Sequence, residues 1–313
     1  MSDSVKGCRE MWKSSLIKVE SVLVLILFFS TFNVAWSDLQ RKVILEKRYE
    51  EPDNQVVRRY EDIILDCGQY GKAYFTISLP KEVPPEGLPC IMIVGGLMTG
   101  RDSLRFIPDH GQYALVAYEY SGTLKKLQKI NVLWNLYAVR KAMIDVPPQL
   151  IEVVKYLQNQ PWIGKEPVDF MGYSFGSIFV PNIYVRAQEE RIKLGPGVMA
   201  YGGAGIHCLL EANVKVPKAL KSPVATIAAA LFKPIDPLIY APKMKGDFLI
   251  INGIYDSQIP FKCAKRLQNI IPEPKTVINL ETEHMHPDNT ELTLRLINIS
   301  RSWLEEKQQS QLN

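Results

Sequence analysis

The chain has 313 residues, of which 47% are hydrophobic and 22% charged, as in a globular protein with one sizeable core. Lys and Arg number 37 against 33 Asp and Glu, so the formal net charge is only +4. The sequence contains no long basic run, so neither a nucleic acid nor another polyanion is expected as a partner.

The first 37 residues differ from the rest of the chain. Residues 22–29 form an uninterrupted apolar run that follows two lysines and leads to a small-x-small pattern at residues 35–37. This combination is typical of a secretory signal peptide, and the run is shorter than the roughly 20 residues of a spanning helix. Residues 1–37 therefore predict a signal peptide and a periplasmic or secreted protein. The alternative is an uncleaved anchor that associates the protein with a membrane.

Strand-like segments follow in chain order. Residues 56–65 and 72–79 are rich in β-branched and aromatic side chains around a glycine-containing turn, which predicts an antiparallel hairpin. Continuous apolar runs then predict strands that are buried on both faces of a parallel sheet. These runs are residues 90–94, 113–118, 168–172 and 246–252, with 275–280 as a further candidate.

Helical patterns separate these strands. Residues 148–158, with Pro148 at the expected helix start, and residues 290–304 each place apolar side chains on one face, and residues 177–188 can also form a helix. Alternating strands and helices predict an α/β fold with right-handed crossovers. Residues 38–313 are therefore expected to form one domain.

One segment interrupts the alternation. Residues 207–245 are apolar but irregular and contain five prolines, with a short helix expected at 224–232. A loop of this length inside a compact domain is usually functional. Residues 207–245 are therefore interpreted as a small cap inserted between two strands; the alternative is a surface connection.

The strongest motif is Gly172-Tyr173-Ser174-Phe175-Gly176, a G-x-S-x-G sequence between a predicted strand and a predicted helix. A serine in a sharp, strained turn presents its hydroxyl above the sheet edge, and bulky side chains two positions away would obstruct that turn. The following helix directs its N-terminal dipole at developing negative charge. Ser174 is therefore the candidate nucleophile.

A serine hydroxyl needs a general base. Of the four histidines, His284 and His286 follow the last predicted strand, where an imidazole can reach back to the serine. His284 is preferred because it lies nearer the strand end, and His286 is the alternative. His110 precedes a strand and is expected on the wrong side of the sheet, whereas His207 opens the presumed cap.

The base in turn needs an acid that fixes its tautomer. Asp256 follows the strand at 246–252 and is the candidate, with Glu281 as a weaker rival. An oxyanion hole needs two backbone N–H groups. One is expected from Phe175, and the other from the glycine-rich loop after residue 94, at Leu97 or alternatively Gly96.

Four cysteines remain after residue 37, namely Cys67, Cys90, Cys208 and Cys263. An oxidising compartment would allow them to pair, and buried free thiols are an equally favoured alternative. No Cys-x-x-Cys spacing is present, so zinc is not indicated.

The three candidate side chains occur in the order Ser, Asp, His that is expected of α/β-hydrolases. On these motifs, residues 55–304 resemble the α/β-hydrolase superfamily, and GGLMTGRDSLRFIP followed by YALVAYEYSG looks like its esterase- and peptidase-like members. Glu283 departs from the pattern, since many relatives have glycine before the histidine, and it keeps the choice between His284 and His286 open. The resemblance implies an eight-stranded, mostly parallel sheet with helices on both faces, and acyl-enzyme chemistry.

The implied function is a serine hydrolase acting on a carboxylic ester or a related acyl bond, with thioester and peptide bonds left open. Two alternatives also stay open: an acyltransferase with the same three side chains, and a non-catalytic protein that binds a hydrophobic ligand. The substrate is expected to be a hydrophobic small molecule, because the presumed cap is apolar. No cofactor and no metal are expected, since the sequence has no P-loop, dinucleotide fingerprint or metal-ligand cluster.

Overall fold

The computed structural model describes residues 43–53, 56–127, 135–214 and 216–312. The chain divides into Met1–Ile44, almost all of which lies outside these residues, and Leu45–Asn313. The predicted signal peptide at residues 1–37 lies outside the described residues.

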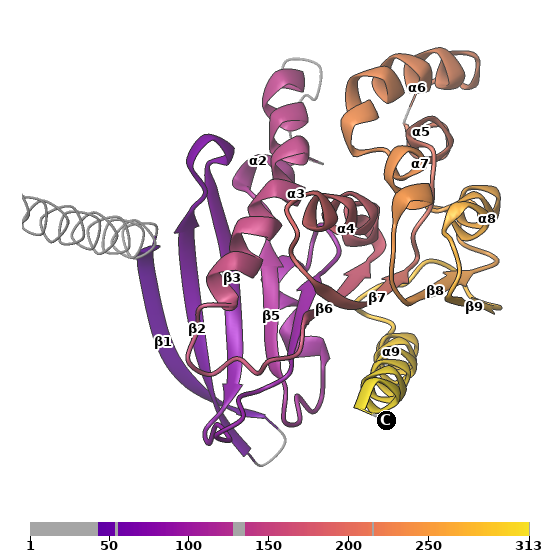
Figure 1. Cartoon of the computed structure of the whole chain (residues 1–313). Coiled ribbons are helices and arrows are strands. Elements are labelled where there is room, and N and C mark those ends of the chain that lie inside the picture. Colours follow the sequence, from indigo (N-terminus) through magenta and orange to yellow (C-terminus); the bar gives the residue numbers. More distant parts are fainter. Residues whose placement is uncertain (1–42, 54–55, 128–134, 215, 313) are drawn as a thin grey trace, which may run out of the picture. The chain divides into compact units, whose positions relative to one another are not determined.

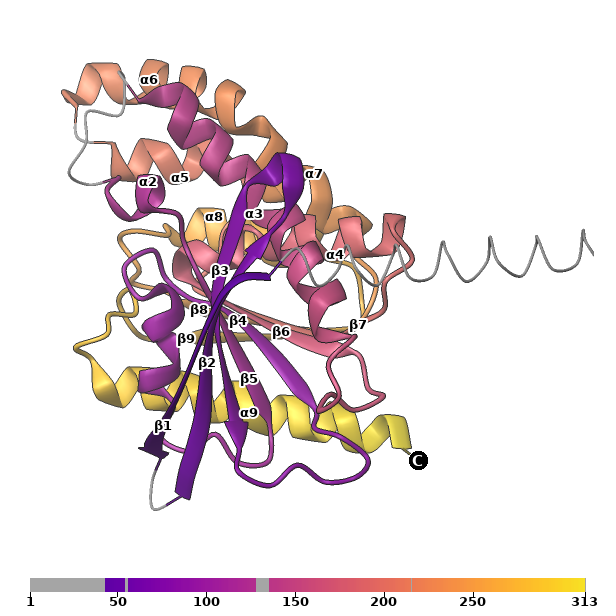
Figure 2. The ribbon, with the colours of Figure 1, turned by 90° about the vertical axis from the view of Figure 1, so that its left-hand side faces the viewer.

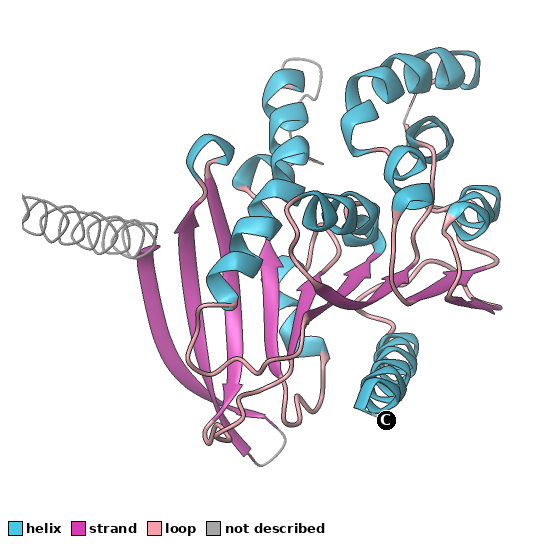
Figure 3. Cartoon of the chain, in the orientation of Figure 1, coloured by secondary structure: helices cyan, strands magenta, loops and turns pink. Residues whose placement is uncertain are grey.

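The described strands form one mixed sheet (Figures 1 and 3). Its order is β1-β2-β3-β5-β4-β6-β7-β8-β9. Strands β2, β3 and β5 pair antiparallel, and all pairs from β5/β4 to β8/β9 are parallel. The bounds are β1 Val43–Asp53, β2 Val56–Asp66, β3 Lys72–Pro80, β4 Cys90–Val94, β5 Ala114–Glu119, β6 Val168–Tyr173, β7 Leu194–Ala200, β8 Phe248–Gly253 and β9 Lys275–Leu280.

The apolar runs of the sequence form the strands that were expected from them. Every residue of β4, β6 and β8 is buried, because helices cover both faces of the parallel part of the sheet. The described sheet has nine strands where eight were expected. Two strands were not predicted: β1, which is rich in charged residues, and β7, which contains two glycines and a proline.

Helices lie on both faces of the sheet. Figure 2 shows α3 (Leu136–Leu157), α4 (Val180–Glu189) and α8 (Phe261–Ile270) on one face and α9 (Thr290–Leu312) on the other. The expected start of α3 at Pro148 is wrong, because the helix begins at Leu136 and contains Pro147 and Pro148 in its interior. The core under α9 contains alternate side chains of β4–β8, packed against Leu292, Leu296, Trp303 and Leu304.

Several short helices connect β7 to β8. They are α5 (Ile206–Asn213), α6 (Lys218–Phe232), η4 (Lys233–Ile235), α7 (Pro237–Tyr240) and η5 (Ala241–Lys243). The helix expected at 224–232 is the second half of α6. In the described part of the chain no single helix is long and apolar enough to cross a membrane. Residues 218–235 and 237–243 meet that criterion only as a pair bent by 47°.

Four further short helices complete the described elements. They are η1 (Gly68–Tyr70), which lies between β2 and β3, η2 (Gly100–Phe106), which follows β4, α2 (Gly122–Lys125), which follows β5, and η3 (Ser174–Ile178), which follows β6.

Candidate active site

The candidate residues follow the carboxyl ends of neighbouring parallel strands. Strand β6 ends just before Ser174, β8 ends three residues before Asp256, and β9 ends four residues before His284. The last residues of β8 and β9, Gly253 and Leu280, are register partners. Because parallel strands present their carboxyl ends at one edge, these loops emerge together.

Ser174 occupies a strained turn at the start of a short 3-10 helix, η3 (Ser174–Ile178). Its φ of 50° lies in the left-handed region that side chains rarely adopt. A Cβ on Gly176 would overlap the backbone carbonyl of Val94, and one on Gly172 would lie 2.8 Å from Ser177 Cα. Both glycines of the motif are therefore needed for the turn to pack against its neighbours.

A chain of hydrogen bonds connects the three candidate side chains. The Ser174 Oγ lies 2.8 Å from His284 Nε2, and His284 Nδ1 lies 2.7 Å from Asp256 Oδ2. The carboxylate favours the tautomer with hydrogen on Nδ1, which leaves Nε2 to accept a hydrogen bond from the serine hydroxyl. Only 9% of the His284 side chain and 1% of the Asp256 side chain are exposed, so water screens this pair little.

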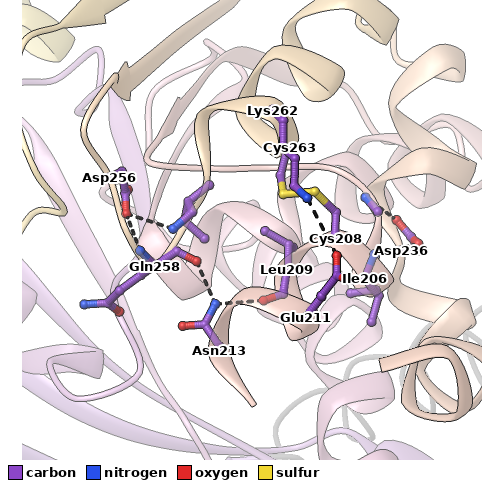
Figure 4. Close-up of a disulfide and its surroundings, with 12 residues drawn as sticks. Ile206, Cys208, Leu209, Glu211, Asn213, Asp236, Asp256, Gln258, Lys262 and Cys263 are labelled. Carbon is purple, nitrogen blue, oxygen red and sulfur yellow. Dashed lines mark hydrogen bonds and ion pairs between the residues drawn. A yellow bond between two sulfur atoms is a disulfide. The ribbon is translucent and has the colours of Figure 1, made fainter. Parts of the chain in front are cut away.

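The protein backbone fixes the orientation of Asp256. Its Oδ1 accepts hydrogen bonds from the N–H groups of Gln258 and Ile259, both at 2.8 Å, and Figure 4 shows this carboxylate beside Gln258. Oδ2 is thereby left to face the imidazole.

The other histidines lie elsewhere. His286 is 64% exposed and pairs with Asp288 instead of reaching Ser174. His110 is buried, with Nδ1 bonded to Ser78 Oγ and Nε2 to the Leu104 carbonyl. His207 lies on α5, with Nε2 3.4 Å from Ser222 Oγ. The structure therefore brings one imidazole, that of His284, to Ser174.

The glycine-rich loop after β4 packs against the serine turn. Leu97 and Gly96 lie in the turn that follows β4, and Phe175 directly follows Ser174. The Tyr120 hydroxyl donates to the Gly95 carbonyl at 2.7 Å, and its ring contacts that of Phe175 with centroids 5.3 Å apart. The two segments that were expected to supply oxyanion donors are thus connected by one tyrosine.

Tyr201 and Thr282 also belong to this site, and the sequence interpretation missed them. Tyr201 directly follows β7, and its hydroxyl lies 2.6 Å from Thr282 Oγ1. Its ring meets the His284 ring edge-on, with centroids 5.5 Å apart. Burial raises the pKa of the Tyr201 hydroxyl, so it stays neutral. No motif in the sequence marks this tyrosine.

The helical insertion is connected to the acid loop and to α8. Asn213 Nδ2 donates to the Gln258 carbonyl at 2.7 Å, and a disulfide joins Cys208 on α5 to Cys263 on α8 (Figure 4). Cys67 and Cys90 are buried thiols. The two alternatives expected for the cysteines, a disulfide and buried thiols, therefore both occur. Among the described residues, no group of three or more His, Cys, Asp or Glu is arranged to hold a metal ion.

No protein-family model matches the sequence, and no curated protein does. Solved structures do resemble this one. An acetyl xylan esterase from Paenibacillus sp. R4 has a TM-score of 0.57 at 16% identity, covering 86% of this chain and 93% of its own. A hyperthermophilic esterase from the archaeon Pyrobaculum calidifontis has a TM-score of 0.53 at 12% identity, covering 79% of this chain and 86% of its own.

The acylaminoacyl peptidase of Pyrococcus horikoshii is a third structural neighbour, with a TM-score of 0.55 at 13% identity. The similarity covers 88% of this chain but only 43% of the peptidase. At such low identities the likeness shows the fold alone. From these neighbours and its sheet, the chain has the α/β-hydrolase fold.

Proposed function

We propose that this protein is a serine hydrolase that cleaves a carboxylic ester or a related acyl bond through an acyl-enzyme intermediate. The observation that carries the proposal is the chain of hydrogen bonds from Ser174 through His284 to Asp256, with the serine held at a φ of 50°. A serine hydroxyl beside a base that a buried carboxylate orients is the arrangement that nucleophilic catalysis needs.

The reaction follows from this geometry. Ser174 Oγ attacks the acyl carbonyl while His284 Nε2 takes its proton, and the Asp256 carboxylate stabilises the imidazolium. The N–H groups of Phe175 and Leu97, with Gly96 as the alternative to Leu97, stabilise the oxyanion. When the tetrahedral intermediate collapses, His284 protonates the leaving alcohol. Water then attacks the acyl-enzyme with His284 as base, which releases the acid and regenerates the serine.

An open depression of about 670 Å³ lies beside the acid loop. It is lined by Ser257 and Gln258, which follow the acid, and by the insertion residues Ala212, Asn213, Val214, Val216, Pro217 and Lys221. Most of the insertion residues in this lining are apolar. This supports a cap role for residues 207–245, with the substrate's apolar part against them. The names of the structural neighbours include both esterases and a peptidase, which is in keeping with acyl chemistry on more than one kind of bond.

The decisive experiment labels the protein with a fluorophosphonate probe and maps the modified peptide. We expect modification of Ser174 in the native protein and none in Ser174→Ala, which should keep its thermal unfolding temperature. His284→Ala should abolish hydrolysis of p-nitrophenyl acetate, whereas His286→Ala, the matched exposed histidine, should not. A Ser174→Ala variant with native turnover would refute the proposal.

Two further readouts separate the alternatives. Analysis of products with a competing alcohol distinguishes hydrolysis from acyl transfer, since a transferase forms the new ester in preference to the acid. A protein that binds an apolar probe but is not labelled is a non-catalytic binder.

We also propose that the protein is exported and that cleavage precedes Asp38. The Cys208–Cys263 disulfide supports export, because such bonds persist in oxidising compartments. Sequencing of the N-terminus of protein recovered outside the cytoplasm should begin at Asp38. An intact N-terminus in a membrane fraction would instead indicate an anchor.

A further inference from the structure

Tyr201 adopts a backbone conformation that its residue type disfavours. Its φ is 56°, in the left-handed region, and its side chain is completely buried. The Tyr201 N–H donates to the Ile251 carbonyl at 2.7 Å, which ties the strained residue to β8. Strained residues of this kind persist where the surrounding structure holds them, and they cluster at functional sites.

The strained backbone places the tyrosine between β7 and the histidine loop. The hydroxyl lies 2.6 Å from Thr282 Oγ1, two residues before His284, and the ring meets the imidazole edge-on at 5.5 Å. One residue therefore contacts both the imidazole and the side chain of Thr282, which belongs to the same loop as His284.

Two backbone hydrogen bonds also hold the loop at Thr282. Thr282 N–H bonds to the Leu280 carbonyl at 2.9 Å, and its own carbonyl accepts from Tyr255 N–H at 3.1 Å. Glu283 is exposed. A Cβ on Gly253 would lie 2.5 Å from the Thr282 carbonyl and 2.9 Å from the Tyr201 ring, so tyrosine and loop pack closely over the end of β8.

We propose that Tyr201 is a positioning residue, which holds the His284 imidazole at hydrogen-bond distance from Ser174 through its hydrogen bond to Thr282 and its ring contact. This inference rests on the proposed function, in which His284 is the general base. It assigns to Tyr201 a support of the imidazole that Ser174 and Asp256 do not provide. The hydroxyl bond orders the loop, and the ring edge limits how far the imidazole can tilt.

Four single variants and one double variant test the proposal. Tyr201→Phe and Thr282→Val each remove the hydroxyl bond from one side, and Thr282→Ser retains it. Tyr184→Phe is the matched control, because the Tyr184 hydroxyl is also buried and donates to the Gly195 carbonyl at 2.8 Å away from the site. Each variant is assayed for kcat and KM on p-nitrophenyl acetate and for thermal unfolding temperature. The proton resonance of His284 Nδ1–H is recorded by NMR.

We expect Tyr201→Phe and Thr282→Val each to lower kcat about tenfold with KM little changed, since one hydrogen bond of ordinary strength is lost. The double variant should lose no more than either single one, because both remove the same bond. Thr282→Ser should keep native kcat. In the two variants that lack the bond, the His284 resonance should shift or broaden, while Tyr184→Phe should change neither kcat nor the resonance.

Native kcat and an unshifted resonance in Thr282→Val overturn the inference, even if Tyr201→Phe fails to fold. An equal loss of kcat in Tyr184→Phe also overturns it, since general destabilisation would then be the cause. Failure of the proposed function looks different, because native protein would then neither turn over ester nor react at Ser174. In that case the NMR comparison still decides whether Tyr201 positions the imidazole.

Discussion

Replacing Asp256 with asparagine exchanges one carboxylate oxygen for an NH2 group at almost constant size. In the native chain Oδ1 accepts two backbone hydrogen bonds of 2.8 Å, from Gln258 and Ile259, while Oδ2 faces His284 Nδ1 at 2.7 Å. The same two donors should hold the amide oxygen at the Oδ1 position, so the NH2 group faces the imidazole. Because this group only donates, Nδ1 becomes an acceptor and the proton moves to Nε2, beside Ser174.

An imidazole that carries hydrogen on Nε2 cannot take the serine proton. The wrong tautomer lowers kcat by about 10⁴ in serine proteases, which is about 5.5 kcal/mol of transition-state stabilisation. We expect a loss of that order for Asp256→Asn. Stability should change little, because both backbone hydrogen bonds to Oδ1 persist in the variant.

The assay measures kcat on p-nitrophenyl acetate together with thermal unfolding. Glu281→Gln is the matched control, since Glu281 is an exposed carboxylate of the neighbouring histidine loop, and it should keep native kcat. The reasoning is refuted if Asp256→Asn hydrolyses the ester at the native rate, or if Glu281→Gln loses activity to the same extent.

Three other expectations concern stability. Burial raises the pKa of Asp169 to about 7, so its contribution to stability is fully present below about pH 4 and is lost as pH rises through about 7. The loss is about 4 kcal/mol for a shift of this size, and Asp169→Asn should flatten the pH dependence of urea unfolding between those limits. Gly176→Ala should cost about 3 kcal/mol or more and prevent probe labelling, because its Cβ meets the backbone of Val94. Gly122→Ala, whose Cβ would have no atom within 4 Å, should neither destabilise the protein nor prevent probe labelling. Cys208→Ser opens a loop with a sequence separation of 55 and should lower the free energy of unfolding by up to about 4 kcal/mol. Dithiothreitol should destabilise the native protein by a similar amount and leave the variant unchanged.

The parts of the fold that the sequence predicts are those where burial alone determines the pattern. Strands β4, β6 and β8 are buried on both faces, so nearly every position is apolar and the run is recognisable. The start of α3 was misplaced because proline usually marks a helix start, whereas Pro147 and Pro148 lie inside this helix.

The sequence predicted which loops carry the candidate site, but it did not determine which histidine of the last loop reaches the serine. Ser174 has a local motif, and the loops after β8 and β9 hold few residues able to act as acid or base. The choice between His284 and His286 depends on which side chain reaches the serine turn, a property of the folded loop that spacing does not contain. In the structure His286 accepts at Nδ1 from the Asp288 N–H at 3.3 Å, in the turn that leads into α9.

The failure to predict strand β7 and the failure to predict Tyr201 as a site residue have one cause. β7 contains Gly197 because a Cβ there would lie 2.7 Å from the Tyr184 hydroxyl and 3.0 Å from the Phe248 ring. Close packing of α4 and β8 therefore requires glycine at this position, where a strand pattern calls for a bulky side chain. Without β7, β6 would pair directly with β8, about 4.8 Å nearer. No element would then separate the serine loop from the acid loop. The residue after β7 is Tyr201, which contacts the His284 imidazole. Because Gly197, which is required for packing, obscures the strand pattern of β7, the sequence did not indicate that Tyr201 lies beside the candidate base.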